Sequence, residues 1–219
     1  MTTTAPDASR QDKYREFVTW VEKRCAEDPG VRVALRRGLR RELDDVRGMH
    51  RIVAAWVREG CPEAEERAYY AVAAMIADRP RHAYASPETD DGADPEPVDP
   101  DEATPKKRPR RDSLGASYAR AVLAQAGRGL REENAEARLN LLTRQSLTGL
   151  HRHLPGNVRH LRDTGTEIDF AALLHDLASW PRFSKPIARR WLQDYYRTRK
   201  TPIENAAKDQ DLDAPATDA

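Results

Sequence analysis

A stretch of thirty residues in the middle of this chain lacks any apolar periodicity, and it limits how the rest can fold. Residues 83–112 are rich in Pro, Asp and Glu and end in the basic run 106–111. Such a segment buries too little apolar surface to offset its ordering entropy, so we expect a disordered linker. It divides the 219-residue chain into two short domains, residues 10–82 and 113–200, before a disordered acidic tail, residues 201–219.

Both short domains carry the apolar repeat of an α-helix, and neither shows convincing strand alternation. In the first domain the repeat predicts four helices, over residues 10–27, 29–46, 52–57 and 62–80. Asp28 and Pro29 are suited to the first two positions of the second of these helices.

The second domain contains several further helix starts, which the sequence places near Ser113, Asn134, Pro155, Asp169 and Ser184. Pro155 is expected to break one helix and begin another. We therefore predict an all-α protein, with two small helical bundles joined by a flexible acidic and basic linker.

Composition and termini favour a soluble protein of the cytoplasm. Mean hydropathy is −0.83, no run of about 18 apolar residues is present, and the N-terminus lacks the apolar core of a signal peptide. We expect no association with a membrane. Cys25 and Cys61 lie far apart without a CxxC spacing, so we expect two reduced, buried thiols.

The formal net charge of +1 hides a sorting of charge by segment. Residues 106–200 carry 20 Lys or Arg against 9 Asp or Glu, a net charge of +11, whereas residues 88–102 hold eight acids and no base. The tail 201–219 has a net charge of −4. A local positive excess of this size favours a polyanionic partner such as nucleic acid.

Two sets of arginines are candidate nucleic-acid contacts. The first lies on the predicted helix 29–46, opposite its leucine stripe: Arg32, Arg36, Arg37, Arg40, Arg41 and Arg47. The second is spread over three predicted helices: Arg120, Arg128, Arg131, Arg138, Arg144, Arg152 and Arg159.

The spacing of these arginines matches no base-reading module, which points to contacts with the nucleic-acid backbone. Merely solvated helix faces are the alternative, because Arg outnumbers Lys by 30 to 7 over the whole chain and a GC-rich genome would give the same bias. The run 106–111 is interpreted as a solvated counterweight to the neighbouring acids, although it could also contact phosphate.

Two groups of residues invite an enzymatic or metal-binding interpretation. His175 and Asp176 form a pair of the kind that binds metal in phosphohydrolases, but their neighbours are leucines and further ligands are missing. His151 and His153 would point about 200° apart on a helix, which is a poor arrangement for chelation. We expect no cofactor, no metal and no catalysis.

From residue 113 onward the order of short motifs resembles the CasB family, the small subunit of the type I-E CRISPR surveillance complex Cascade. The motifs are Ser113–Gly115, Arg138–Leu142 with Arg144, Leu150–Leu154, Ile168–Phe170, Leu173–Leu177 with Trp180, and Trp191 with Asp194–Tyr196. The N-terminal part agrees more loosely, through an aromatic first helix followed by Arg36 and Arg37.

The resemblance implies a non-enzymatic subunit, present in two copies in the complex alongside the other Cascade subunits. It would contact the guide RNA, the target DNA strand and the displaced DNA strand, and stabilise the R-loop. The family's basic contacts would fall on Arg36, Arg37, Arg138, Arg144, Arg159 and Lys185.

Together with the charge pattern, this gives a predicted nucleic-acid site of ten residues: Arg36, Arg37, Arg40, Arg41, Arg120, Arg138, Arg144, Arg152, Arg159 and Lys185. An HD-type metal-dependent phosphohydrolase and a helical DNA-binding regulator are the alternative functions.

Overall fold

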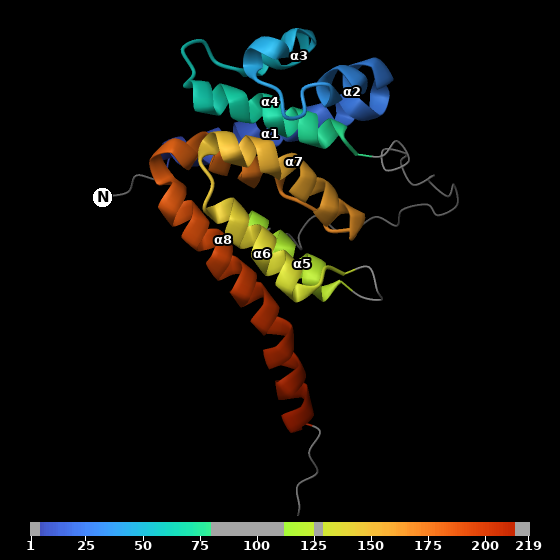
Figure 1. Ribbon diagram of the computed structural model, residues 1–219, viewed down its shortest axis with the longest axis vertical. Coiled ribbons are helices and arrows are strands. Elements are labelled where there is room, and N and C mark those ends of the chain that lie inside the picture. The colour runs from blue at the N-terminus through green and yellow to red at the C-terminus, as the bar shows by residue number, and fades with distance from the viewer. Residues whose placement is uncertain (1–4, 80–111, 125–128, 213–219) are drawn as a thin grey trace, which may run out of the picture.

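The computed structural model describes residues 5–79, 112–124 and 129–212, with side chains for residues 10–200 of those ranges. Within these ranges the protein is all-α, as predicted (Figure 1). The N-terminal half contains α1 (Ala5–Glu27), α2 (Pro29–Arg36), α3 (Arg47–Val53) and α4 (Glu63–Ala77). The C-terminal half contains α5 (Leu114–Leu123), α6 (Glu132–Thr143), α7 (Leu147–Asp163) and α8 (Phe170–Leu212).

Side-chain caps fix the starts of four helices. Asp28 accepts hydrogen bonds from the backbone N–H groups at the start of α2, and Pro29 takes the first helical position, as predicted. Ser113 and Asp169 cap α5 and α8 in the same way. Ser146 caps α7, a start that the sequence analysis did not predict.

Several predicted helix boundaries are wrong, among them the helix expected over 52–57, which is α3 at Arg47–Val53 followed by a short 3₁₀ helix at Ala54–Trp56. The helix expected over 29–46 ends at Arg36, because the chain turns at Gly38, which lies directly against Met49 of α3. Pro155 lies inside α7, where the buried apolar stripe continues through it. The helix expected to start at Asn134 begins at Glu132.

The long helix α8 is bent at Phe183, whose backbone leaves helical geometry (φ −130°, ψ 28°). Pro186 has no N–H to donate to the carbonyl of Arg182, four residues earlier, and its ring clashes with that carbonyl, which favours a break in this turn. This agrees with the predicted helix start near Ser184. Beyond Lys200, α8 continues to Leu212, through the first part of the segment expected to be a disordered tail.

The two halves lie in contact in this structure. α1 and α4 pack against α8, and α4 also packs against α7. Arg162 on α7 donates a hydrogen bond to the carbonyl of Met75 on α4 (2.6 Å). Buried side chains of both halves form one continuous cluster. Its largest members include Tyr14, Phe17, Leu35, Tyr118, Trp191 and Tyr195. The domain boundaries stay predictions, and the linker residues 83–111 lie outside the described residues.

Candidate nucleic-acid interface

Arg36 and Arg159, predicted from distant parts of the sequence, meet at one carboxylate. Arg36 Nε lies 3.1 Å from Oδ1 of Asp78, and Arg159 Nε donates to Oδ2 at 3.0 Å. The side chain of Asp78 is only 7% exposed, whereas both arginines are largely exposed. One buried carboxylate therefore positions two guanidinium groups, from α2 and α7, on the same surface and leaves a net positive charge there.

The turn after α2 brings two more arginines to this surface. Arg40 has a left-handed backbone conformation (φ 61°), which is uncommon for a residue other than glycine. Its guanidinium reaches α7, because a Cβ placed on Gly156 would lie 3.1 Å from Arg40 Nη2. Arg37 and Arg41, on either side of this turn, are exposed.

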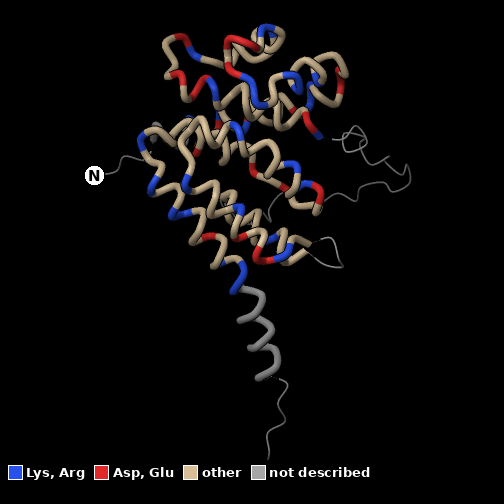
Figure 2. The backbone as a smooth tube through the Cα atoms, viewed as in Figure 1, with Lys and Arg blue, Asp and Glu red and all other residues tan. Residues whose placement is uncertain are grey.

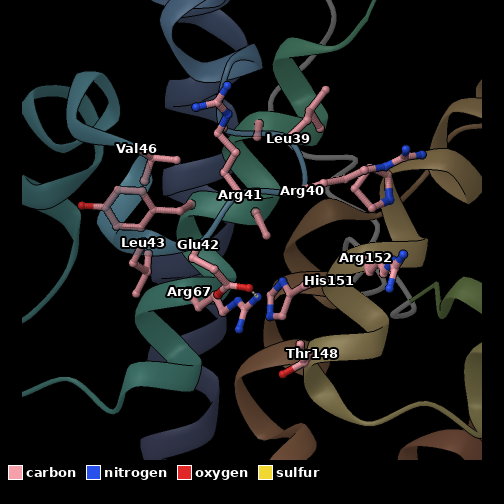
Figure 3. A pocket seen from close by; sticks show the side chains of 15 residues that line it. Leu39, Arg40, Arg41, Glu42, Leu43, Val46, Arg67, Thr148, His151 and Arg152 are labelled. Carbon is pink, nitrogen blue, oxygen red and sulfur yellow. Dashed lines mark hydrogen bonds and ion pairs between the residues drawn. The ribbon is translucent and has the colours of Figure 1, made fainter.

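A pocket of about 470 Å³ lies between this turn, α4 and α7. Figure 3 shows Arg40 and Arg152 on one side of it, with Arg67 and His151 close together on the other. Leu39, Leu43 and other apolar residues line the rest: Val46, Tyr70, Ala71, Ala74 and Pro155. The pocket is therefore built from both halves of the chain.

Five of the ten predicted site residues thus gather along the boundary between the halves, and the exposed Arg37 follows Arg36 directly in the chain. We call them the arginine band: Arg36, Arg37, Arg40, Arg41, Arg152 and Arg159. Figure 2 shows basic positions in both halves near this boundary. Its N-terminal members, Arg36, Arg37, Arg40 and Arg41, do not share the one helix face that the predicted helix 29–46 implied, because α2 ends at Arg36. Tertiary packing of α7 against the N-terminal half assembles the band.

The other four predicted residues lie elsewhere. Arg120 on α5 pairs with Asp112 (2.9 Å), which offsets its charge. Arg138 is exposed on α6. Arg144 ends α6 beside Gln145, whose carbonyl accepts a hydrogen bond from Trp180 on α8, and Lys185 is exposed just after the bend of α8. The basic run 106–111 lies outside the described residues.

The carboxylate of Asp176 is part of the core of α8. It is 2% exposed, accepts a hydrogen bond from Trp191 Nε1 (2.7 Å) at one oxygen and bonds Arg190 at the other. His175 Nδ1 lies 3.5 Å from Oδ1 of Asp176, the oxygen that bonds Arg190. Both oxygens are therefore engaged in tying the two segments of the bent helix together.

Asp176 should make the free energy of unfolding depend on pH in the acidic range. Burial alone would raise its pKa, but hydrogen bonds from His175, Arg190 and Trp191 outweigh burial and lower it. The stabilisation is complete above the unfolded-state pKa of about 3.9 and is lost as pH falls through the lower folded-state value.

We therefore expect Asp176→Asn to lower the free energy of unfolding at pH 7 by roughly 1–3 kcal/mol. Urea unfolding at pH 7 and at pH 3 measures this. The difference between variant and wild type should shrink at the lower pH. An equal difference at both values would mean that the charge of Asp176 contributes nothing.

Two residues that line this pocket, Arg67 and His151, are not among the predicted site residues. The sequence raises His151 only as a candidate metal ligand, and it places Arg67 directly after three glutamates of α4. No local signal places either residue beside the other, because α4 and α7 lie far apart in the sequence. Arg67 and Ala71 are four residues apart and therefore share one face of α4, and both line the pocket opposite α7.

Among the residues that the structure describes, no three His, Cys, Asp or Glu side chains are grouped so that they could hold a metal ion. No helix in the same part of the chain is long and apolar enough to span a membrane.

The chain is similar to known proteins over most of its length. Residues 31–196 match the family model described as CRISPR-associated protein Cse2. A chain of a "CRISPR RNA-guided surveillance complex" is 36% identical, with a TM-score of 0.74 over 90% of this chain and 99% of that one.

A second such complex, "pre-nicking", gives 36% identity and a TM-score of 0.73 over 90% and 98% of the two chains. The crystal structure of M. ruber CasB is 23% identical with a TM-score of 0.60 over 92% and 98%, which shows a shared fold. No curated protein matches this chain.

Proposed function

The chain belongs to the Cse2 family of CRISPR-associated proteins, and on that premise we propose that it is a non-catalytic subunit of an RNA-guided surveillance complex. The matched chains of such complexes correspond to this chain over nearly their full length. CRISPR RNA and the other subunits of the complex are accordingly its partners.

Within that complex, we propose that the arginine band binds the sugar-phosphate backbone of a nucleic-acid strand. The observation that carries this proposal is the convergence of five arginines of the band from both halves, with Arg36 and Arg159 held by the same buried carboxylate. Guanidinium groups bind phosphate oxygens through paired N–H donors and need no base sequence to do so.

The band would act by stabilising the R-loop, in which guide RNA pairs with the target strand and displaces the other DNA strand. The exchange of a DNA duplex for an RNA–DNA duplex is nearly balanced in free energy, so a few backbone contacts can shift it. Base pairing supplies the sequence recognition. Two copies of the subunit in each complex, with Arg138, Arg144 and Lys185 as further contacts, complete the proposal.

The phosphohydrolase alternative requires His175 and Asp176 to be free to hold a metal. Both carboxylate oxygens of Asp176 instead bond other side chains, so this pair is better suited to a structural role. A sequence-specific regulator would need a helix shaped to enter a DNA groove, whereas the band is spread over a helix end, a turn and α7.

We expect the isolated protein to bind single-stranded nucleic acid weakly and without sequence preference. Log affinity should fall with log salt concentration, with a slope magnitude of about 3–6 if that many phosphates are neutralised. Fluorescence anisotropy with oligonucleotides of two unrelated sequences measures both properties. If affinity hardly changes between about 50 and about 200 mM salt, binding to the nucleic-acid backbone is contradicted.

A further inference from the structure

The pocket between the two halves contains two buried nitrogens that have no hydrogen-bond partner, Nε of Arg67 and Nε2 of His151. His151 is 6% exposed and the side chain of Arg67 is 15% exposed. Arg67 uses another nitrogen, Nη2, to donate to Glu42 (2.7 Å). Leaving a buried polar group unpaired is costly, so these two nitrogens favour an occupant of the pocket that accepts hydrogen bonds.

The charge around these nitrogens favours an anion. Burial and the neighbouring Arg67 lower the pKa of His151 to about 4, so the imidazole is neutral near pH 7 and carries one N–H. With that hydrogen on Nε2, both unpaired atoms are donors. Arg40, Arg41 and Arg152 line the same pocket against a single carboxylate, that of Glu42.

The size of the pocket exceeds what a lone phosphate needs. About 470 Å³ lies within the range of small-molecule sites, which place a few polar groups in a largely apolar lining. Leu39, Leu43 and Tyr70 also line the pocket and supply apolar surface there. This combination matches one nucleotide unit, with its phosphate at the donors and its nucleoside against the apolar residues.

We propose that this pocket binds one phosphate group of a nucleic-acid strand, with Nε of Arg67 and Nε2 of His151 as its donors. The adjoining nucleoside lies against Leu39, Leu43 and Tyr70. This inference rests on the proposed function, because Arg40, Arg41 and Arg152 of the arginine band form the rim of the pocket. Beyond contacts on the surface of the band, the proposal gives the strand one binding site inside the protein, between its two halves.

The first test follows the histidine ring signals of the full-length protein by NMR, with His151→Leu identifying the His151 signal. We expect a short single-stranded oligonucleotide to shift the His151 signal saturably and to raise the pKa of His151 by about one unit or more. Inorganic phosphate is titrated separately. A shift with inorganic phosphate and none with the oligonucleotide would overturn the assignment to a strand.

The second test uses a change that separates binding from folding. His151→Leu replaces an unpaired buried ring with an apolar side chain, so we expect Tm to rise by roughly 2–4 °C while affinity for the oligonucleotide falls about tenfold. His153→Leu, on the same helix but outside the pocket lining, is the matched control and should leave affinity unchanged. A lower Tm with unchanged affinity would assign His151 a purely structural role and refute phosphate binding in the pocket.

The inference and the proposed function fail in different ways. If the pocket is wrong but the arginine band is right, the oligonucleotide still binds with a steep salt dependence, and His151→Leu binds as well as wild type. If the protein does not bind nucleic acid at all, neither the salt dependence nor the His151 shift is observed.

Discussion

Gly115→Ala should abolish the native packing of α5 against α8. A Cβ at this position would lie 1.7 Å from the carbonyl oxygen and 2.6 Å from the carbonyl carbon of Trp191. These are backbone atoms, so no side-chain rotation relieves the overlap, and the two helices must move apart. That movement would open the core around Tyr118 and Trp191, both fully buried. We expect the free energy of unfolding to fall by about 3–5 kcal/mol.

Gly48→Ala is the matched control for this change. Gly48 lies in α3, and a Cβ there would meet no atom within 4 Å. Because alanine favours the helix over glycine, we expect stabilisation by about 0.5–1 kcal/mol. Urea unfolding of both variants and the wild type gives the comparison. Equal, small effects of the two substitutions would show that α5 and α8 are not in close contact at Gly115.

The all-α fold and several helix starts could be predicted because their causes are local. The cap at Asp28 with Pro29, the cap at Ser113 and the interruption near Ser184 depend on residues within a few positions of one another. Pro155 was misjudged because its helix is stabilised by tertiary burial: Leu150, Leu154 and Val158 are all buried. That burial outweighs the one backbone hydrogen bond which proline removes.

The sequence predicts which arginines belong to the candidate site, but it does not predict how they are arranged in space. Charge and family resemblance selected Arg36 and Arg159, yet nothing in the sequence indicates that both would bond Asp78. The sequence also gives no sign that the predicted helix 29–46 would end early and turn Arg40 toward α7. These features depend on contacts between residues far apart in the chain, which periodicity does not report.

Changing three arginines of the band should have the largest effect on function. The structure suggests Arg37, Arg40 and Arg152, because removing Arg36 or Arg159 would also take a partner from the buried Asp78 and could destabilise the fold. Arg37→Gln, Arg40→Gln and Arg152→Gln together remove three exposed positive charges, and none of these arginines forms an ion pair with another described residue. We expect oligonucleotide affinity to fall by about tenfold to a hundredfold at low salt.

A matched triple variant keeps the change in net charge constant. Arg15→Gln, Arg51→Gln and Arg58→Gln alter three exposed arginines of α1, α3 and the following loop, outside the band. Both triple variants should unfold at nearly the wild-type urea concentration. If the control variant loses as much affinity as the band variant, binding depends on net charge and the band has no special role.

The lifetime of the R-loop in the assembled surveillance complex tests the central claim most directly. Complexes are reconstituted with wild-type subunit, the band variant, the control variant or His175→Gln, and R-loop dissociation is followed after competitor DNA is added. We predict a lifetime shortened at least about tenfold for the band variant alone. A band variant that holds the R-loop as long as wild type, while His175→Gln abolishes function, would contradict the account and favour a catalytic role.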